Sequence, residues 1–171
     1  MAAFKKVSVE SLTENPFTLI GKDWMLITAG DETKYNTMTA SWGGVGVLWN
    51  KPVSYIVVRP QRYTKEFIDA EDSYSLSFFD DSWRSMLNVC GTKSGRDIDK
   101  AAETGITPVF TEAAPYFEEA KLVLICKKHF MQPMQEASFL SPELLAQYYP
   151  EKDLHILYIG EIETVLIRDD A

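Results

Sequence analysis

Short runs of β-branched and aromatic residues, separated by Gly, Pro, Asn and Asp, set the hydrophobic pattern of this chain. Such runs predict strands that end at turns. The predicted strands are residues 17–20, 24–29, 36–42, 53–58, 73–79, 119–130 and 154–167. The run 53–58 is apolar enough to predict a strand buried on both faces. Residues 107–115, which contain two prolines, are expected to form a loop or an edge strand.

Helical periodicity is confined to four short segments. Thr64 is expected to cap the N-terminus of the first helix. Gly91 and Gly105 are expected to close the second and the third. Ser141 and Pro150 are expected to bracket the fourth. The predicted helices cover residues 65–69, 83–89, 97–104 and 142–149.

The order of these elements predicts a mainly β fold with short helices. Many connections are short enough for hairpins, so a largely antiparallel, Greek-key-like barrel fits better than a doubly wound parallel sheet. The length of 171 residues and the hydrophobic share of 46% are enough for one packed core. We therefore expect a single domain over residues 1–171.

Charge and hydropathy exclude two classes of partner. The net charge is −8, without the basic patch that nucleic-acid binding requires. The longest apolar runs, such as residues 121–126, are far shorter than the roughly 20 residues needed to cross a bilayer, and the N-terminus lacks an apolar signal segment. The chain is expected to be cytoplasmic and to bind neither nucleic acid nor membrane.

The sequence offers neither a metal site nor a common catalytic motif. Cys90 and Cys126 match no metal or redox spacing and are expected to be reduced, partly buried thiols. His129 and His155 are too few for a histidine-rich metal site, so no protein-bound metal is predicted. No G-x-G-x-x-G, P-loop or nucleophile elbow is present.

Residues 36–42, Asn-Thr-Met-Thr-Ala-Ser-Trp, are the first candidate for ligand chemistry. In an extended strand, Thr37, Thr39 and Ser41 share one face. Their hydroxyls and the backbone of residues 38–42 can bond the polar edge of a flat ligand. The alternative is that this face is simply solvated.

Two further segments are candidates for binding an anion. Arg59, Arg62 and Thr64 combine guanidinium groups with a predicted helix N-terminus. Residues 94–100, Ser-Gly-Arg-Asp-Ile-Asp-Lys, supply a hydroxyl, permissive backbone and two cations. Alternatively, the arginines cap carbonyls or pair with carboxylates, and the second segment is a charged turn. Together with residues 36–42, these segments favour a phosphate-bearing cofactor such as FMN.

Four motifs follow one another along the chain: Asn-x-Met-Thr-Ala-Ser-Trp, Trp-Asn-Lys-Pro, Arg-Pro-x-Arg-Tyr-Thr and Gly-x-x-Ser-Gly-Arg-Asp-x-Asp-Lys. In this order they resemble the flavin reductase-like family with the FMN-binding split barrel fold, and flavoredoxin-type members in particular. This resemblance spans nearly the whole chain. It implies a homodimer with one FMN per subunit near the interface, the ring against residues 39–42, and the phosphate near Arg62, Thr64 and residues 94–100. The residues expected to bind the cofactor are Asn36, Met38, Thr39, Ala40, Ser41, Trp42, Arg59, Arg62, Tyr63, Thr64, Ser94, Gly95, Arg96 and Lys100.

His155 precedes a Gly-Glu strand, as in the family pattern, and is the candidate catalytic residue. It is expected to approach the flavin or nicotinamide, although a structural histidine on a strand is the alternative. Three functions stay open: a flavin reductase that uses NADH or NADPH, a flavoredoxin-like carrier that passes electrons to a redox protein partner, and a ligand-binding barrel with no redox role. No nicotinamide-binding element is recognisable in the sequence.

Overall fold

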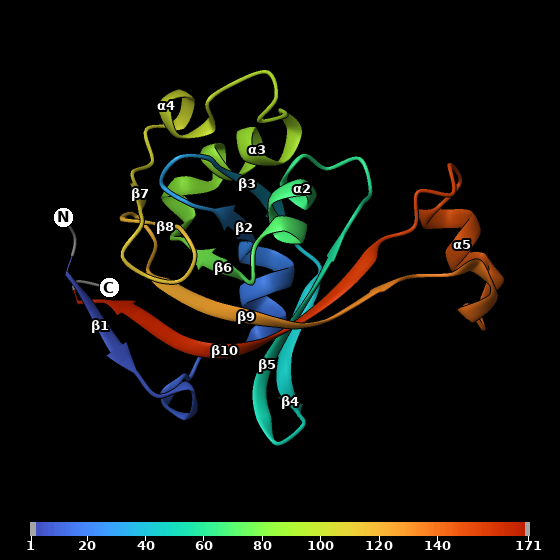
Figure 1. The fold of residues 1–171 in the computed structure, drawn as a ribbon, viewed down its shortest axis with the longest axis horizontal. Coiled ribbons are helices and arrows are strands. Elements are labelled where there is room, and N and C mark those ends of the chain that lie inside the picture. Colours follow the sequence, from blue (N-terminus) through green and yellow to red (C-terminus); the bar gives the residue numbers. More distant parts are fainter. Residues whose placement is uncertain (1–2, 170–171) are drawn as a thin grey trace.

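The computed structural model describes residues 3–169, and one antiparallel sheet of eight strands dominates it (Figure 1). The strand order is β3-β2-β6-β9-β10-β5-β4, and β1 pairs with β10. The strands are β1 (Phe4–Val7), β2 (Met25–Gly30), β3 (Tyr35–Ala40), β4 (Gly43–Leu48), β5 (Lys51–Val58), β6 (Ser73–Phe78), β9 (Leu122–Pro133) and β10 (Ile156–Arg168). A separate small pair joins β7 (Pro108–Val109) to β8 (Tyr116–Phe117).

The helices are short and lie in the connections. They are α1 (Pro16–Thr18), α2 (Thr64–Ala70), α3 (Arg84–Thr92), α4 (Lys100–Thr104) and α5 (Pro142–Tyr148). A π-helical turn (Leu19–Asp23) continues α1, and 3-10 turns cover Val9–Ser11, Asp81–Trp83 and Glu136–Ser138. In the described part of the chain, no helix has the length and apolar character needed to cross a membrane.

The link between β3 and β4 explains why the sheet curls. These strands follow each other in the chain but lie at opposite ends of the strand order, and only Ser41 and Trp42 separate them. Two linking residues span at most about 11 Å between Cα atoms. The two edges must therefore meet at this link, and because β3 and β4 are not paired, the barrel stays split there. We call this place the seam.

Two hydrophobic clusters occupy the two faces of the curled sheet. Successive residues of β2 show why, since Met25 and Ile27 enter one cluster and Leu26 the other. The first cluster fills the curl and includes Ile56, Tyr74, Phe78, Leu124 and Tyr158. The second lies between the sheet and α3 and includes Phe79, Leu87, Phe117 and Val123. All six residues of β2 are buried for this reason.

Most predicted strands and helices are confirmed within a few residues of their ends, but residues 17–20 are an error. They are helical because the Asn15 side chain caps the N–H of Phe17 and Pro16 occupies the first turn. The chain also forms β4 over a glycine-rich stretch that no hydrophobic pattern marked. Conversely, Ser41 and Trp42 lie beyond the end of β3, outside any strand.

Three local expectations are also wrong. Thr64 does not cap α2, because its hydroxyl accepts a hydrogen bond from Asn36 Nδ2 at 2.8 Å. Gly91 does not close its helix, since α3 continues to Thr92. The strand β5 is not buried on both faces, because Tyr55 is 45% exposed.

Beyond the barrel, β9 and β10 continue as a two-stranded arm that carries α5, and β4 and β5 form a second projecting hairpin (Figure 1). The register of β9 and β10 shifts between Ile159 and Gly160. At Gly160 the backbone lies against Tyr74, whose hydroxyl is bonded to Ser54 Oγ at 2.7 Å. A Cβ at Gly160 would lie 2.7 Å from that hydroxyl oxygen.

We therefore expect Gly160→Ala to lower the free energy of unfolding by about 1 to 3 kcal/mol, because the buried Tyr74 ring has no room to move. Gly46→Ala is the control, since a Cβ there meets nothing within 4 Å, and its effect should stay within about 0.5 kcal/mol. Urea unfolding followed by circular dichroism measures both. Equal losses in the two variants would contradict the close packing at Gly160.

Candidate functional site

Two adjoining cavities lie at the seam. The seam cavity has a volume of about 460 Å³, and its lining residues are Met38, Thr39, Ala40, Ser41, Trp42, Val57, Arg59, Gln61, Arg62, Gly91 and His155. The loop cavity has a volume of about 190 Å³, and its lining residues are Asn36, Met38, Gln61, Arg62, Tyr63, Thr64, Thr92, Lys93, Ser94, Gly95 and Lys100. Both cavities share Met38, Gln61 and Arg62, so they are neighbours across these side chains.

The cavities gather the residues that the sequence nominated from three distant segments. Each nominated cofactor residue lines one cavity or both, except Arg96. Val57, Gln61, Gly91, Thr92 and Lys93 also line them and were missed. Gly91 is the first residue of the Gly-x-x-Ser-Gly-Arg motif, and Gln61, Thr92 and Lys93 are variable positions within the motifs, so only Val57 lies outside them. The packing of α3 against β3 brings Gly91 and its neighbours to the seam.

Arg62 forms the wall between the two cavities. Its guanidinium donates to the carbonyl of Gly91 at 2.9 Å and to that of Thr39 at 3.2 Å, which ties the end of α3 to β3. Burial, and to a smaller extent the nearby Arg59, lower the pKa of Arg62. The guanidinium carries five N–H donors, so several remain for a ligand.

Lys100 is a second buried cation, 6% exposed. Its Nζ donates to the carbonyls of Thr37 and Cys90, both at 2.7 Å. Burial is the main cause that lowers its pKa to about 8, and Arg62 contributes. Within residues 3–169, no carboxylate forms an ion pair with Arg62 or Lys100, so their charge favours an anion in the loop cavity.

The rest of the loop cavity is polar and closely fitted. Asn36 donates to the hydroxyl of Thr64 and also touches the backbone of Gly95, where a Cβ would lie only 2.0 Å from Asn36 Oδ1. Glycine is therefore required for the loop to lie against β3. The Ser94 hydroxyl accepts the N–H of Arg96 at 3.1 Å, which leaves its own proton for a ligand.

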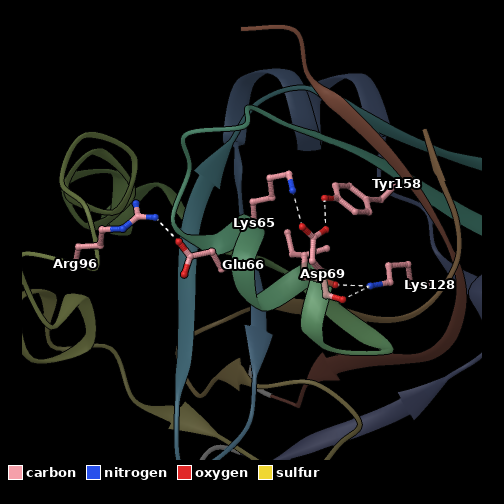
Figure 2. Close-up of polar contacts among 7 residues, drawn as sticks. Lys65, Glu66, Asp69, Arg96, Lys128 and Tyr158 are labelled. Atoms are coloured by element: carbon pink, nitrogen blue, oxygen red, sulfur yellow. Dashed lines mark hydrogen bonds and ion pairs between the residues drawn. The ribbon is translucent and has the colours of Figure 1, made fainter. Parts of the chain in front are cut away.

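The helix α2, which begins at Thr64, is held in place from its far end (Figure 2). The Asp69 carboxylate accepts hydrogen bonds from Tyr158 at 2.6 Å and from Lys65 at 2.5 Å. Burial of Asp69 opposes its charge, but these two bonds outweigh it and lower its pKa. Lys128 donates to the carbonyl of Ile68 at 2.5 Å. These contacts fix the C-terminal end of α2, while Thr64 at its N-terminal end lines the loop cavity.

Two of the cations that the sequence predicted for cofactor binding form ion pairs within the chain instead. Arg96 forms an ion pair with Glu66 (Figure 2), and its guanidinium lies 4.4 Å from the centre of the Tyr63 ring. Arg59 lines the seam cavity but pairs with Asp153 at 2.8 Å and donates to the carbonyl of Tyr148 at 3.0 Å. Both therefore make the structural contacts that the sequence left as an alternative, and Arg59 ties the arm to the barrel.

His155 lies on the opposite wall of the seam cavity and is 7% exposed. Its Nδ1 is 2.8 Å from the Tyr149 hydroxyl, and its ring centre is 5.3 Å from that of Trp42. Burial is the main cause that lowers its pKa to about 4; Arg59 and Arg62 also lower it, and Asp153 opposes them. The imidazole is therefore neutral at pH 7.

Within the described residues, no group of three or more His, Cys, Asp and Glu side chains is arranged to hold a metal ion. Cys90 and Cys126 are both free and fully buried. Burial raises the pKa of Cys90 to about 11 and that of Cys126 to about 12. Neither thiol is poised as a nucleophile.

Comparisons with known proteins agree with this architecture. Residues 18–171 match the family model of the flavin reductase like domain. A comparison with curated protein sequences finds no match.

Among solved structures, the chain is similar to a Shewanella frigidimarina protein with a split barrel domain: 19% identity, coverage of 96% of this chain and 77% of that chain, and a TM-score of 0.68. It is also similar to the flavoredoxin of Methanosarcina acetivorans: 20% identity, 96% and 76% coverage, TM-score 0.68. An FMN-binding domain from Shewanella baltica gives 18% identity, 98% and 78% coverage, and the same TM-score. The predicted mainly antiparallel split barrel is confirmed.

The neutral state of His155 makes stability depend on pH. Its pKa is lower in the folded chain than the ordinary 6.5, so the unfolded chain binds the proton more tightly. The stability that comes from this difference in pKa is fully present above pH 6.5 and is lost as the pH falls toward 4. We expect the free energy of unfolding to fall by about 2 kcal/mol between pH 7 and pH 5.

Urea unfolding at both pH values tests this expectation. His155→Gln should remove most of the fall, whereas His129→Gln, which alters the other histidine, should keep it. The lowered pKa of Asp69 affects stability only below about pH 4, outside this window. If the free energy of unfolding of His155→Gln fell as much as that of the native chain, the pH dependence could not be assigned to His155.

Proposed function

The chain belongs to the flavin reductase-like family, and we propose that it binds FMN across the seam and loop cavities and uses NADH or NADPH as reductant. One observation carries the proposal: a wide cavity adjoins a small one that faces two cations without carboxylate partners. FMN has the same division, with a broad ring at one end and a phosphate at the other. We assign the ring to the seam cavity and the phosphate to the loop cavity.

The loop cavity fits a phosphate chemically. Arg62 and Lys100 supply positive charge, and the Thr64 and Ser94 hydroxyls supply further hydrogen-bonding groups. A buried anion is costly unless it is paired and hydrogen-bonded. This group of residues meets both conditions for a phosphate.

The seam cavity fits the polar edge of a flavin ring. Ser41 and Trp42 lie between β3 and β4, and in the described part of the chain no ladder pairs their backbone groups. These N–H and C=O groups are therefore available to a ligand. When bound, FMN supplies the hydride and electron chemistry, while the protein orients it and excludes water. We expect the nicotinamide to enter beside Trp42 and His155.

The visible spectrum of the purified protein, followed by anaerobic addition of NADH or NADPH, tests the function. A flavin spectrum that bleaches rapidly with nicotinamide is the expected result. A flavin that bleaches only with a chemical reductant would favour a flavoredoxin-like carrier serving a redox protein. A colourless protein that FMN does not reconstitute would exclude both flavin functions and leave a ligand-binding barrel.

The phosphate assignment predicts that FMN and riboflavin respond differently to Lys100→Met. We expect FMN affinity to fall by about 10- to 150-fold, the range for a lost hydrogen bond to a charged group. Riboflavin lacks the phosphate, so its affinity should change little, which also shows that the variant is folded. Lys127→Met removes an exposed lysine on β9 and is the control. Fluorescence titration with the native chain and both variants measures all six affinities, and an equal loss for both flavins in Lys100→Met would contradict the assignment.

We further propose that the protein is a homodimer formed through the β4–β5 hairpin. On this hairpin Val47 is 79% exposed, Trp49 51% and Tyr55 45%, and Tyr55 is in register with Ile159 of β10. Ile159 is in turn in register with Phe130 of β9, which is 39% exposed. Exposed apolar side chains therefore lie on both faces of the hairpin: Tyr55 is in register with Gly44 and Val47 with Pro52, so the two side chains point to opposite faces. Apolar exposure of this extent is unusual on a monomer. A cavity of about 430 Å³, lined by Val45, Val47, Leu12, Leu19 and other side chains, lies on the Val47 face.

A two-fold axis would place the same hairpin surface on both sides of the interface. Val47→Glu should therefore convert a dimer to the 19.4 kDa monomer in sedimentation velocity experiments. Ala102→Glu, on the exposed surface of α4, adds the same charge and should leave the dimer intact. A native chain that sediments as a monomer at all concentrations would refute the homodimer.

A further inference from the structure

We propose that Tyr149 is a positioning residue that holds the neutral His155 as the tautomer with its proton on Nε2. His155 then presents an N–H donor to the seam cavity. The tautomer itself depends only on the protein. Its use toward a ligand rests on the proposed function, because the ligand that meets this donor is the ring bound in the seam cavity.

The contacts of His155 leave one ring nitrogen for the cavity. Nδ1 lies 2.8 Å from the Tyr149 hydroxyl, and the two rings are nearly perpendicular at 82°. Among residues 3–169, Nε2 has no protein partner. Because His155 lines the seam cavity, Nε2 is the nitrogen available to a ligand there.

The direction of the Tyr149–His155 hydrogen bond decides the tautomer. If the phenol donates, Nδ1 is the acceptor and the proton must be on Nε2. In the opposite arrangement, Nδ1–H donates to the phenol oxygen, and the phenol proton can turn only toward Met134 Sδ at 3.7 Å, a weak acceptor. The first arrangement pairs the better donor, the phenol O–H, with the better acceptor, the imidazole nitrogen, whereas the second has an N–H···O bond to the poorer phenol acceptor and a weak O–H···S contact. The first arrangement is therefore the more stable one.

The charges around the pair support the same arrangement. The Arg59 guanidinium lies 5.1 Å from the centre of the Tyr149 ring, and Arg62 lines the same cavity as His155. Both cations oppose a third positive charge on the imidazole, and Asp153, which favours that charge, is already paired with Arg59. A cation beside a phenol also favours donation by its hydroxyl proton. His155 is thus neutral and accepts at Nδ1.

Packing fixes the direction in which this donor points. Trp42 contacts both the imidazole and the Tyr148 ring, with ring centres 5.3 Å apart in each case. Tyr149 is itself 8% exposed and packs against Phe139 of the arm. The Trp42 contact holds the plane of the imidazole, and a flip of the ring within that plane would break the Nδ1 hydrogen bond to Tyr149. His155 therefore offers one Nε2–H donor, which suits a carbonyl oxygen or a ring nitrogen of the bound ligand.

The test is NMR of histidine labelled with nitrogen-15 in the flavin-free protein at pH 7. Two-bond nitrogen–proton correlations identify which ring nitrogen carries the proton, and His129→Gln assigns the two histidines. We expect His155 to carry its proton on Nε2. In Tyr149→Phe, the ratio of the two tautomers should shift by about five- to tenfold toward Nδ1–H, the change expected for one lost neutral hydrogen bond.

Tyr148→Phe is the matched control, because this neighbour packs on Trp42 by its ring and, within residues 3–169, its hydroxyl forms no hydrogen bond with His155. It should leave the His155 correlations unchanged. A proton on Nδ1 in the native chain, or an unchanged tautomer ratio in Tyr149→Phe, would overturn the proposal. The measurement needs no flavin. A protein that does not bind FMN would therefore contradict the proposed function but would not affect the assignment of the His155 tautomer.

Discussion

A two-residue link between strands at opposite edges of one sheet is the constraint on which the rest of this structure depends. Ser41 and Trp42 reach only about 11 Å, so β3 and β4 must approach each other and the sheet must curl. Since no ladder joins the two edges, the barrel stays open at the seam. The same link thus creates both the cavity and the unpaired backbone groups that face it.

The polar wall of the site follows from how this seam is held. Arg62 joins β3 to α3 through two carbonyls, and Lys100 joins β3 to the same helix from the other side. Both side chains therefore have a structural role and also bring positive charge to the loop cavity. Arg59 ties the arm to the barrel in a similar way. Burial is the main cause that keeps His155 neutral, and Arg59 and Arg62 add to it. Structural cations and candidate ligand-binding cations are largely the same residues here.

The sequence predicted strands well where burial repeats along the chain, as in β2, β6 and β9. It failed where one polar contact decided the outcome. Residues 17–20 have strand-like composition, but the Asn15 cap and Pro16 make them helical. Thr64 has the chemistry of an N-cap, but a partner 28 positions away, Asn36, uses its hydroxyl instead. The strand β4 was missed because glycines at 43, 44 and 46 interrupt its hydrophobic residues, and its pairing with β5 is made by the backbone.

The sequence by itself determined most of the elements, the antiparallel class, and the polar and cationic residues that gather at the seam, because periodicity and local chemistry are properties of short segments. Only the tertiary structure decided which of those cations remain without a carboxylate partner. Arg59 and Arg96 are neutralised by Asp153 and Glu66, whereas Arg62 and Lys100 contact only carbonyls in the described part of the chain. The curl of the sheet likewise brought His155 and Tyr149 to the seam. Such pairings depend on distances in space between residues far apart in sequence, which no local pattern contains.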